Sequence, residues 1–348
     1  METMITPGLP VEIGRIDKEL GKLWESSDDT KTRASLINLA IYTEDTGAVS
    51  TNTELIATIA GEHACRAILV LANPEAPESQ AKAWISAHCH LAGKGGRQIC
   101  SEQITFQLDG DAAAALPNVV FSHLDSDLPF CLWWQAPFRE SLDENLWVWV
   151  DRLIFDSATW ADPSGQFALV ERISCLGDSS MVRCDLNWTR LYNCRFALAS
   201  MFDHAAALPC LSRIEAVKIV CAPGNRVAAI LLLGWLAAQL GWRLQGSLSR
   251  QFFVDAGGRH ITFEIVEAAG AIISHVELSC DDACFELRRE AGAEFFAGRI
   301  RAPGVPESAL TLRAGRDKIT DVLLAELSRG GRHPLYAKAL AVVMPLLE

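Results

Sequence analysis

The feature that most constrains the fold is an uncharged apolar run at residues 227–238, VAAILLLGWLAA. A membrane-spanning helix needs about 20 apolar residues, so twelve are too few to cross a bilayer. The run therefore predicts a helix buried on all sides, which only a large core can provide. The composition allows such a core, because 50% of the 348 residues are hydrophobic. The same composition excludes a wholly disordered chain.

The N-terminal half alternates between strand and helix patterns. Apolar residues at helical spacing predict an amphipathic helix over residues 11–26, followed by a polar linker. A second helix is expected over 53–64, with Asn52 or Thr53 near its N-cap. The expected strands cover residues 36–42, 66–74, 83–92, 97–109, 118–124, 129–134 and 152–157.

The C-terminal half contains more helix at first and then a series of strands. Two helices are expected over 165–177 and 187–203, a strand from 216, and the long apolar helix over 225–240. Alternating residues with Gly turns between 251 and 315 predict hairpins with one solvated face. Helices over 317–330 and 333–347 close the chain.

These patterns predict an α/β fold, α+β in the C-terminal part, with two domains whose mixed sheets are flanked by helices. We expect an N-terminal amphipathic helix and linker at 1–29. An α/β domain at 30–160 and an α+β domain at 161–348 follow.

Charge and cysteine content limit the partners and the compartment. A net charge of −12 argues against nucleic acid and against an anionic membrane as partners. The N-terminus lacks the basic start and apolar core of a signal peptide. Eleven cysteines are then expected to be mostly reduced and buried, in a cytoplasmic protein.

The common catalytic and cofactor signatures are missing from the sequence. It contains no Walker loop, no dinucleotide-binding glycine fingerprint and no Gly-x-Ser-x-Gly elbow. The glycine-rich stretch at 93–96 joins two expected strands and is interpreted as a turn. We therefore predict no cofactor and no enzyme activity.

One candidate metal site lies on the expected strand around His88, Cys89 and His90. The two histidines share a face while Cys89 points away, which leaves at most three ligands with Cys100. Packing or hydrogen bonding on the strand face is the favoured alternative, so no metal is predicted.

Two further candidates are a thiol pair and an anion site. Cys280 and Cys284 flank an expected hairpin turn. They could form a regulatory disulfide, but two unrelated thiols are the favoured interpretation. Gly224, Asn225 and Arg226 open the long helix, where free backbone N–H groups and a cation could bind an anion. An ordinary Asn N-cap is the favoured alternative.

Tryptophans are concentrated between residues 133 and 188, which hold six of the ten. Trp133 and Trp134 point to opposite faces if they lie on a strand. Core packing and a partner surface both remain open for them, and we expect one indole to pack inward and the other to lie near the domain junction or the partner surface. Trp188 and Arg190 cannot share a helix face. Trp188 is expected in the core, with Arg190 partly exposed or paired with a carboxylate such as Asp185 or Asp203.

Three blocks carry a family resemblance: DSDLPFCLWWQAPF at 125–138, VDRLIFDS at 150–157 and DLNWTRLYNCRFALASMFD at 185–203. They resemble the OpcA family of glucose-6-phosphate dehydrogenase assembly proteins, and AWISAHCHL and QICSEQITF resemble its cyanobacterial branch. The resemblance runs from about residue 30 to the C-terminus. At 194–196 this chain has Cys-Arg-Phe where many family members have Trp-Arg-Glu.

The resemblance implies a non-catalytic partner that binds glucose-6-phosphate dehydrogenase and activates it in the oxidative pentose phosphate pathway. The partner-binding candidates are Trp133, Trp134, Arg190 and Arg195. Cysteine content and the cyanobacterial resemblance also suggest thioredoxin-linked redox regulation. Two alternatives stay open: a scaffold without kinetic effect, and a sugar-phosphate sensor or enzyme that uses Arg190 and the 224–226 turn.

Overall fold

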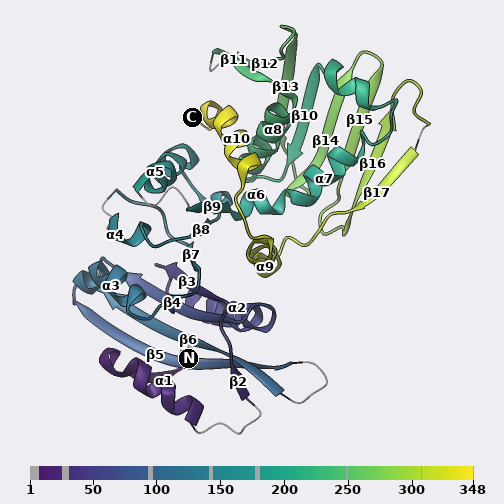
Figure 1. The fold of residues 1–348 in the computed structure, drawn as a ribbon. Coiled ribbons are helices and arrows are strands. Elements are labelled where there is room, and N and C mark those ends of the chain that lie inside the picture. Colours follow the sequence, from purple (N-terminus) through teal and green to yellow (C-terminus); the bar gives the residue numbers. More distant parts are fainter. Residues whose placement is uncertain are drawn as a thin grey trace. The chain divides into compact units, whose positions relative to one another are not determined.

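The computed structural model describes residues 8–25, 31–92, 97–140, 144–176, 181–247, 250–306 and 308–347. Its contacts divide the chain into two compact units (Figure 1). Unit 1 comprises residues 1–155, 166–184 and 323–331, and unit 2 comprises 156–165, 185–322 and 332–348. Segments 166–184 and 323–331, which we assigned to a C-terminal domain, thus group with unit 1, as does the N-terminal helix. No helix in the described part of the chain is long and apolar enough to cross a membrane.

Unit 1 is built on a nine-stranded mixed sheet with the order β1-β5-β6-β4-β3-β7-β8-β9, where β2 also pairs with β6. Strands β6, β4, β3, β7 and β8 run parallel to their neighbours within this series, and β5 is antiparallel to both β1 and β6. The strands are β1 (Leu9–Val11), β2 (Lys31–Arg33), β3 (Ile37–Thr43), β4 (Cys65–Asn73), β5 (Gln80–Ala92), β6 (Arg97–Asp109), β7 (Phe130–Trp134), β8 (Arg152–Phe155) and β9 (Val182–Asp185).

Helices cover both faces of this sheet. Arg66 on β4 hydrogen-bonds Asp17 on α1, whereas Gln103 on β6 hydrogen-bonds Thr53 on α2. Gln103 is in register with Ala67, the neighbour of Arg66, so Arg66 and Gln103 point to opposite faces and the two helices lie on opposite sides of the sheet. The helices are α1 (Ile16–Glu25), α2 (Ala48–Glu62), α3 (Leu116–Phe121), α4 (Glu144–Trp147) and α5 (Pro163–Leu176).

Two local predictions in unit 1 were wrong. Residues 116–121 form helix α3 rather than a strand, with a proline in its first turn, where the missing N–H costs nothing. Helix α2 begins at Ala48, five residues before the predicted start, with Gly47 as its N-cap. Asn52 is instead buried inside the helix. The turn at 93–96 lies outside the described residues, as does part of the 26–35 linker.

Unit 2 is built on an eight-stranded sheet with the order β11-β12-β13-β10-β14-β15-β16-β17. Only the β10–β13 pair is parallel among its strand pairs. The strands are β10 (Ala216–Cys221), β11 (Arg243–Ser247), β12 (Arg250–Val254), β13 (His260–Glu267), β14 (Ile273–Cys280), β15 (Ala283–Arg288), β16 (Phe295–Arg301) and β17 (Ser308–Arg313). Strands β11 and β16 were missing from the predicted series.

The predicted apolar helix forms the centre of unit 2. It is α8 (Arg226–Leu240), and every residue from Ala228 to Ala237 is buried. A Cβ at Gly234 would lie 2.6 Å from the carbonyl oxygen of Ala339, so the glycine allows α10 to approach closely. The other helices are α6 (Leu186–Arg190), α7 (Tyr192–Ser200), α9 (Ile319–Arg329), which divides between the units, and α10 (Pro334–Val343).

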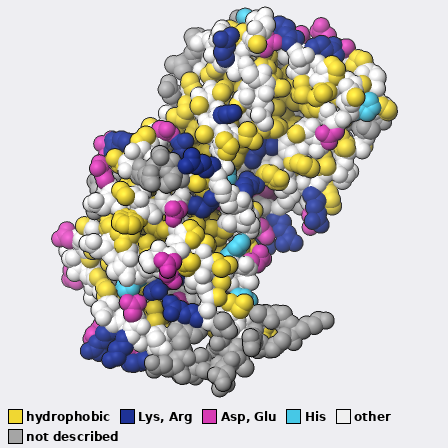
Figure 2. All heavy atoms as spheres, viewed as in Figure 1, with side chains coloured by type: hydrophobic (Ala, Val, Ile, Leu, Met, Phe, Trp, Pro, Cys, Tyr) yellow, Lys and Arg dark blue, Asp and Glu magenta, His cyan; other side chains and the backbone are white. Residues whose placement is uncertain are grey.

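The two units share a mixed α/β architecture, as predicted from the sequence. On the face that Figure 2 shows, basic and acidic side chains are interspersed among hydrophobic ones. No single-sign field dominates that face, which agrees with a modest excess of acidic residues over basic ones.

Candidate functional site

Arg190 forms a buried ion pair with Asp156 in unit 2. Its two terminal nitrogens donate to the two carboxylate oxygens over 2.7 and 2.5 Å, the bidentate geometry of a strong arginine–carboxylate pair. The side chains are only 11% and 12% exposed. The prediction of a carboxylate partner is therefore confirmed, but the partner is Asp156 rather than Asp185 or Asp203.

Asp185 lies beside this pair and is almost completely buried. It caps α6 by accepting from the Asn187 N–H over 2.9 Å, and it also accepts from the N–H and hydroxyl of Ser157 and the hydroxyl of Tyr336. Burial, together with the negative charge of Asp156, raises the pKa of this carboxyl to about 7. The group is thus tied into the protein interior from several sides.

Trp188 and Arg195 lie next to each other close to this cluster. Trp188 is 3% exposed, as predicted. The Arg195 guanidinium lies 3.6 Å from the centre of the Trp188 ring and donates to the Trp188 carbonyl over 2.8 Å. Arg195 is itself 7% exposed. It therefore packs in the interior and leaves little surface for a partner to contact.

Trp133 and Trp134 are both buried in β7, at 5% and 2% exposure. Neither indole is therefore exposed as a partner surface would require. Trp134 stacks on Tyr42 with ring centres 3.8 Å apart and packs against Trp147 on α4. Because β7 pairs with β3 on one side and β8 on the other, with helices on both faces, both indoles are core residues.

The carboxyl ends of β3 and β7 are where an open parallel sheet ordinarily binds a ligand, because the chain leaves these strands in opposite directions. Here the chain's own side chains join the two ends. Asn52 and Gln135 exchange hydrogen bonds of 2.8 and 2.9 Å. Glu44, after β3, forms an ion pair with Arg139, after β7.

An acidic residue also occupies the start of the helix that follows β3. The Asp45 carboxylate accepts from the Gly47 N–H over 2.8 Å, where a bound phosphate would otherwise interact with α2. Although burial opposes it, hydrogen bonds from Arg139 and Tyr42 hold the pKa of Glu44 below its ordinary value. Two carboxylates therefore stand at this edge, which disfavours a dinucleotide there.

The predicted anion site at the start of α8 also faces a carboxylate. The Gly224 N–H points to Glu267 over 3.4 Å, and the Asn225 amide donates to the Pro223 carbonyl. Gly224 has φ 78°, a conformation that favours glycine. Arg226 is exposed. The turn thus already has an acidic partner of its own.

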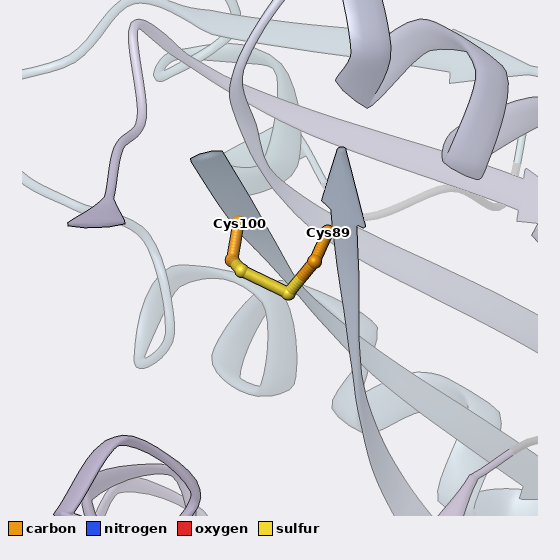
Figure 3. Close-up of a disulfide and its surroundings, with 2 residues drawn as sticks. All are labelled: Cys89 and Cys100. Carbon is orange, nitrogen blue, oxygen red and sulfur yellow. A yellow bond between two sulfur atoms is a disulfide. The ribbon is translucent and has the colours of Figure 1, made fainter. Parts of the chain in front are cut away.

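The sequence left a metal-ligand set of His88, His90 and Cys100 open as a disfavoured alternative, and the structure does not bring these three side chains to one face. Cys89 and Cys100 are in register on β5 and β6 and form a disulfide, so Cys100 lies on the face away from the histidines (Figure 3). His88 instead hydrogen-bonds Gln103 over 2.7 Å, which is the favoured alternative of strand-face packing.

Cys280 and Cys284 are separate thiols in the structure. Cys280 pairs in register with Ala283, and Cys284 pairs with Ser279, so the two side chains point to opposite faces of the hairpin. Burial raises the pKa of both thiols, which lowers their thiolate content and reactivity. A disulfide between them would require rearrangement of the hairpin.

The sequence analysis identified Arg190 and Trp188 but missed most of the residues that hold this cluster together through hydrogen bonds and ion pairs. Asp156 and Ser157 lie some thirty positions before Asp185, and Tyr336 lies about 150 positions after it. The one available signal was that Asp156 and Ser157 end the block VDRLIFDS, which shares the family resemblance with the block containing Arg190.

Comparisons with known proteins agree with those blocks. Residues 56–172 match the family model described as glucose-6-phosphate dehydrogenase subunit N-terminal domain, and residues 182–340 match the model of its C-terminal domain. Two solved structures are similar in fold. An aldose-aldose oxidoreductase from Caulobacter crescentus is 13% identical and covers 89% of this chain and 96% of its own. An oxidoreductase domain protein from Kribbella flavida is 10% identical and covers 90% of this chain and 96% of its own. Their TM-scores are 0.45 and 0.48, and a likeness this weak carries no argument about function.

Curated relatives extend the match over nearly the whole chain. A "Putative OxPP cycle protein OpcA" from Synechococcus elongatus is 28% identical over 98% of this chain and 79% of its own length. Its namesake from Nostoc punctiforme is 30% identical over 83% of this chain and 66% of its own length. Since the two family models together match most of the chain, it belongs to the OpcA family of glucose-6-phosphate dehydrogenase assembly proteins.

Proposed function

We propose that the protein binds glucose-6-phosphate dehydrogenase directly and raises its activity, without catalysing a reaction of its own, in the cytoplasm. The observation that carries the proposal is the match of residues 56–172 and 182–340 to the two domain models of a glucose-6-phosphate dehydrogenase subunit. The net charge of −12 supports a protein partner over nucleic acid or an anionic membrane.

The non-catalytic part of the proposal draws support from the carboxyl edge of the unit 1 sheet. Side chains of the chain itself join β3 to β7 there, and Glu44 and Asp45 place negative charge where a phosphate would bind. In unit 2, four polar residues of the shared blocks pair with one another: Asp156 with Arg190, and Ser157 with Asp185. They are suited to holding a scaffold in shape rather than to binding a substrate.

The test is a titration of the purified protein into the dehydrogenase from the same organism. We expect a complex in sedimentation analysis and an increased rate of glucose 6-phosphate oxidation. Absence of a complex would overturn the proposal. A complex with unchanged kinetics would identify a scaffold, and a calorimetric heat with glucose 6-phosphate alone would favour the sugar-phosphate sensor.

We further propose that thioredoxin regulates this chain through the Cys89–Cys100 disulfide rather than through Cys280 and Cys284. Cys89 is exposed on β5 and open to attack by a dithiol, whereas Cys100 is buried. A reduced thioredoxin would supply two electrons and two protons, break the S–S bond and leave two thiols.

This redox step is tested by measuring activation with the oxidised and the thioredoxin-reduced protein. We expect the two forms to differ, and the Cys89→Ser variant to behave identically under both conditions. Cys280→Ser is the matched control and should keep the wild-type response. Equal activation by both wild-type forms would contradict the proposal.

A further inference from the structure

A pocket of about 400 Å³ opens at the amino-terminal edge of the parallel strands of unit 1. Asn38 lies at the start of β3, Phe130 begins β7, and Asp151 immediately precedes β8. The volume lies within the range of ordinary binding pockets. It is at the edge opposite to the one that Asn52 and Gln135 close.

The floor of the pocket is held rigidly. The buried Asn38 side chain donates to the carbonyls of Asp125 and Leu128 over 2.9 and 3.0 Å and accepts from the Asp125 N–H. The Asp151 carboxylate accepts from the Phe130 N–H over 2.8 Å. The loop from Asp125 to Phe130 is therefore preorganised, which lowers the entropic cost of binding.

The walls are aromatic. Phe121 lies between Phe130 and Trp149, with ring centres 6.4 and 6.0 Å away. Trp149 is 66% exposed and its neighbour Val148 is 50% exposed, although both line the pocket. A large indole left uncovered at a pocket rim is typical of an interface centre, where a protein partner completes its burial.

The charge of the pocket is negative. Asp125 and Asp151 line it, and none of its described lining residues is Lys, Arg or His. Neither carboxylate forms an ion pair with a cation among the residues that the structure describes. An arginine fits this combination, because its guanidinium stacks on an indole and binds a carboxylate through two N–H groups.

We propose that this pocket receives an arginine-bearing segment of the dehydrogenase, an inference that rests on the proposed function. The aliphatic stem of the arginine contacts Phe121 and Leu128. Its guanidinium stacks on Trp149 and pairs with Asp125. A protein segment is favoured over a small cation because small-molecule sites enclose most of their ligand, whereas Trp149 and Val148 are largely exposed.

The first test measures the affinity of the full chain for the dehydrogenase. Trp149→Ala and Asp125→Lys should each weaken binding tenfold or more, and Asp125→Lys should also reduce the association rate at low salt. Leu91→Ala and Asp127→Lys are matched controls, since Leu91 is exposed elsewhere on unit 1 and Asp127 is an exposed neighbour of the pocket. We expect both controls to stay within twofold of wild type.

The second test uses protein labelled with 5-fluorotryptophan, with the Trp149 resonance assigned by Trp149→Phe. The resonance should shift when the dehydrogenase is added. If the complex forms but this resonance and the variant affinities do not change, the pocket proposal is overturned while the proposed function stands. If no complex forms, both fall together. An equal shift with spermidine alone would identify a small-cation site and overturn the assignment to a protein segment.

Discussion

The sheet of unit 1 is buried on both faces, whereas the sheet of unit 2 is buried on one face. In unit 1, β4 and β7 are buried at nearly every position, because helices cover both faces. In unit 2, β10 and β16 alternate between buried and accessible residues. The α7 and α8 side of that sheet is apolar, and the other side carries Lys218, Glu277 and Arg299 in one register row.

The difference shows where each unit can tolerate change. A strand buried on both faces has no position that faces water, so every side chain in it contributes to packing. A strand buried on one face offers every second residue to solvent. Unit 2 adds a contrast of its own, since its interior beside α6 contains the charged Asp156–Arg190 pair.

The largest effects should come from core truncations in the two sheets. Ile68 and Leu69 are adjacent on β4, and each change to Ala should cost about 2–5 kcal/mol because both are fully buried. On β16, Ile300→Ala should cost a similar amount, whereas Arg299→Ala should stay within about 0.5 kcal/mol. Urea unfolding of the four variants measures this. A small cost for either β4 variant would contradict burial on both faces.

Arg190→Ala should destabilise unit 2 by about 3 kcal/mol, because it leaves the buried Asp156 carboxylate without its cation. Of the two alternatives left open from the sequence, the partly exposed arginine is therefore not the one observed, since the side chain is 11% exposed. The double variant Arg190→Ala with Asp156→Ala should recover part of the loss. A normal melting temperature for Arg190→Ala alone would show that the pair is dispensable.

Asp185 should make stability depend on pH. Its pKa is raised to about 7 in the folded state, so folding holds the proton more tightly than the unfolded chain does, where the pKa is about 4. The resulting stabilisation is complete below about pH 4 and is lost as the pH rises toward 7. Relative to Asp185→Asn, which lacks this titration, the wild-type free energy of unfolding should fall by at most about 1.4 kcal/mol per pH unit in that window. A pH-independent difference would show that the four donors keep Asp185 ionised.

The smallest effect is expected on the open face of the unit 2 sheet. Lys218 forms an ion pair with Glu264 over 2.8 Å, but both side chains are substantially exposed. Surface pairs of this kind contribute between about 0 and 1 kcal/mol. Lys218→Ala should therefore leave the melting temperature almost unchanged, with Val217→Ala on the buried face as the destabilised control. A large loss for Lys218→Ala would mean that something covers this face.

The sequence alone determined much of this architecture. The apolar run at 227–238 predicted a helix buried all round, and α8 is that helix. Apolar runs in the first half and alternation in the second half predicted most strands of the two sheets, but not β1, β2, β9, β11 and β16. Trp188 was correctly assigned to the core because its neighbours along the helix are apolar. Such local patterns are reliable because helix and strand periodicity directly reflect which faces meet water.

Only the tertiary structure decided which distant groups meet. Asp156 rather than Asp185 pairs with Arg190, and Tyr336 reaches Asp185 from the C-terminal helix. The strand register set Cys89 opposite Cys100 and kept Cys280 and Cys284 on opposite faces. Periodicity tells which side of its own element a residue occupies. Pairing across elements depends on register and on the order of strands in the sheet, which one sequence does not encode locally.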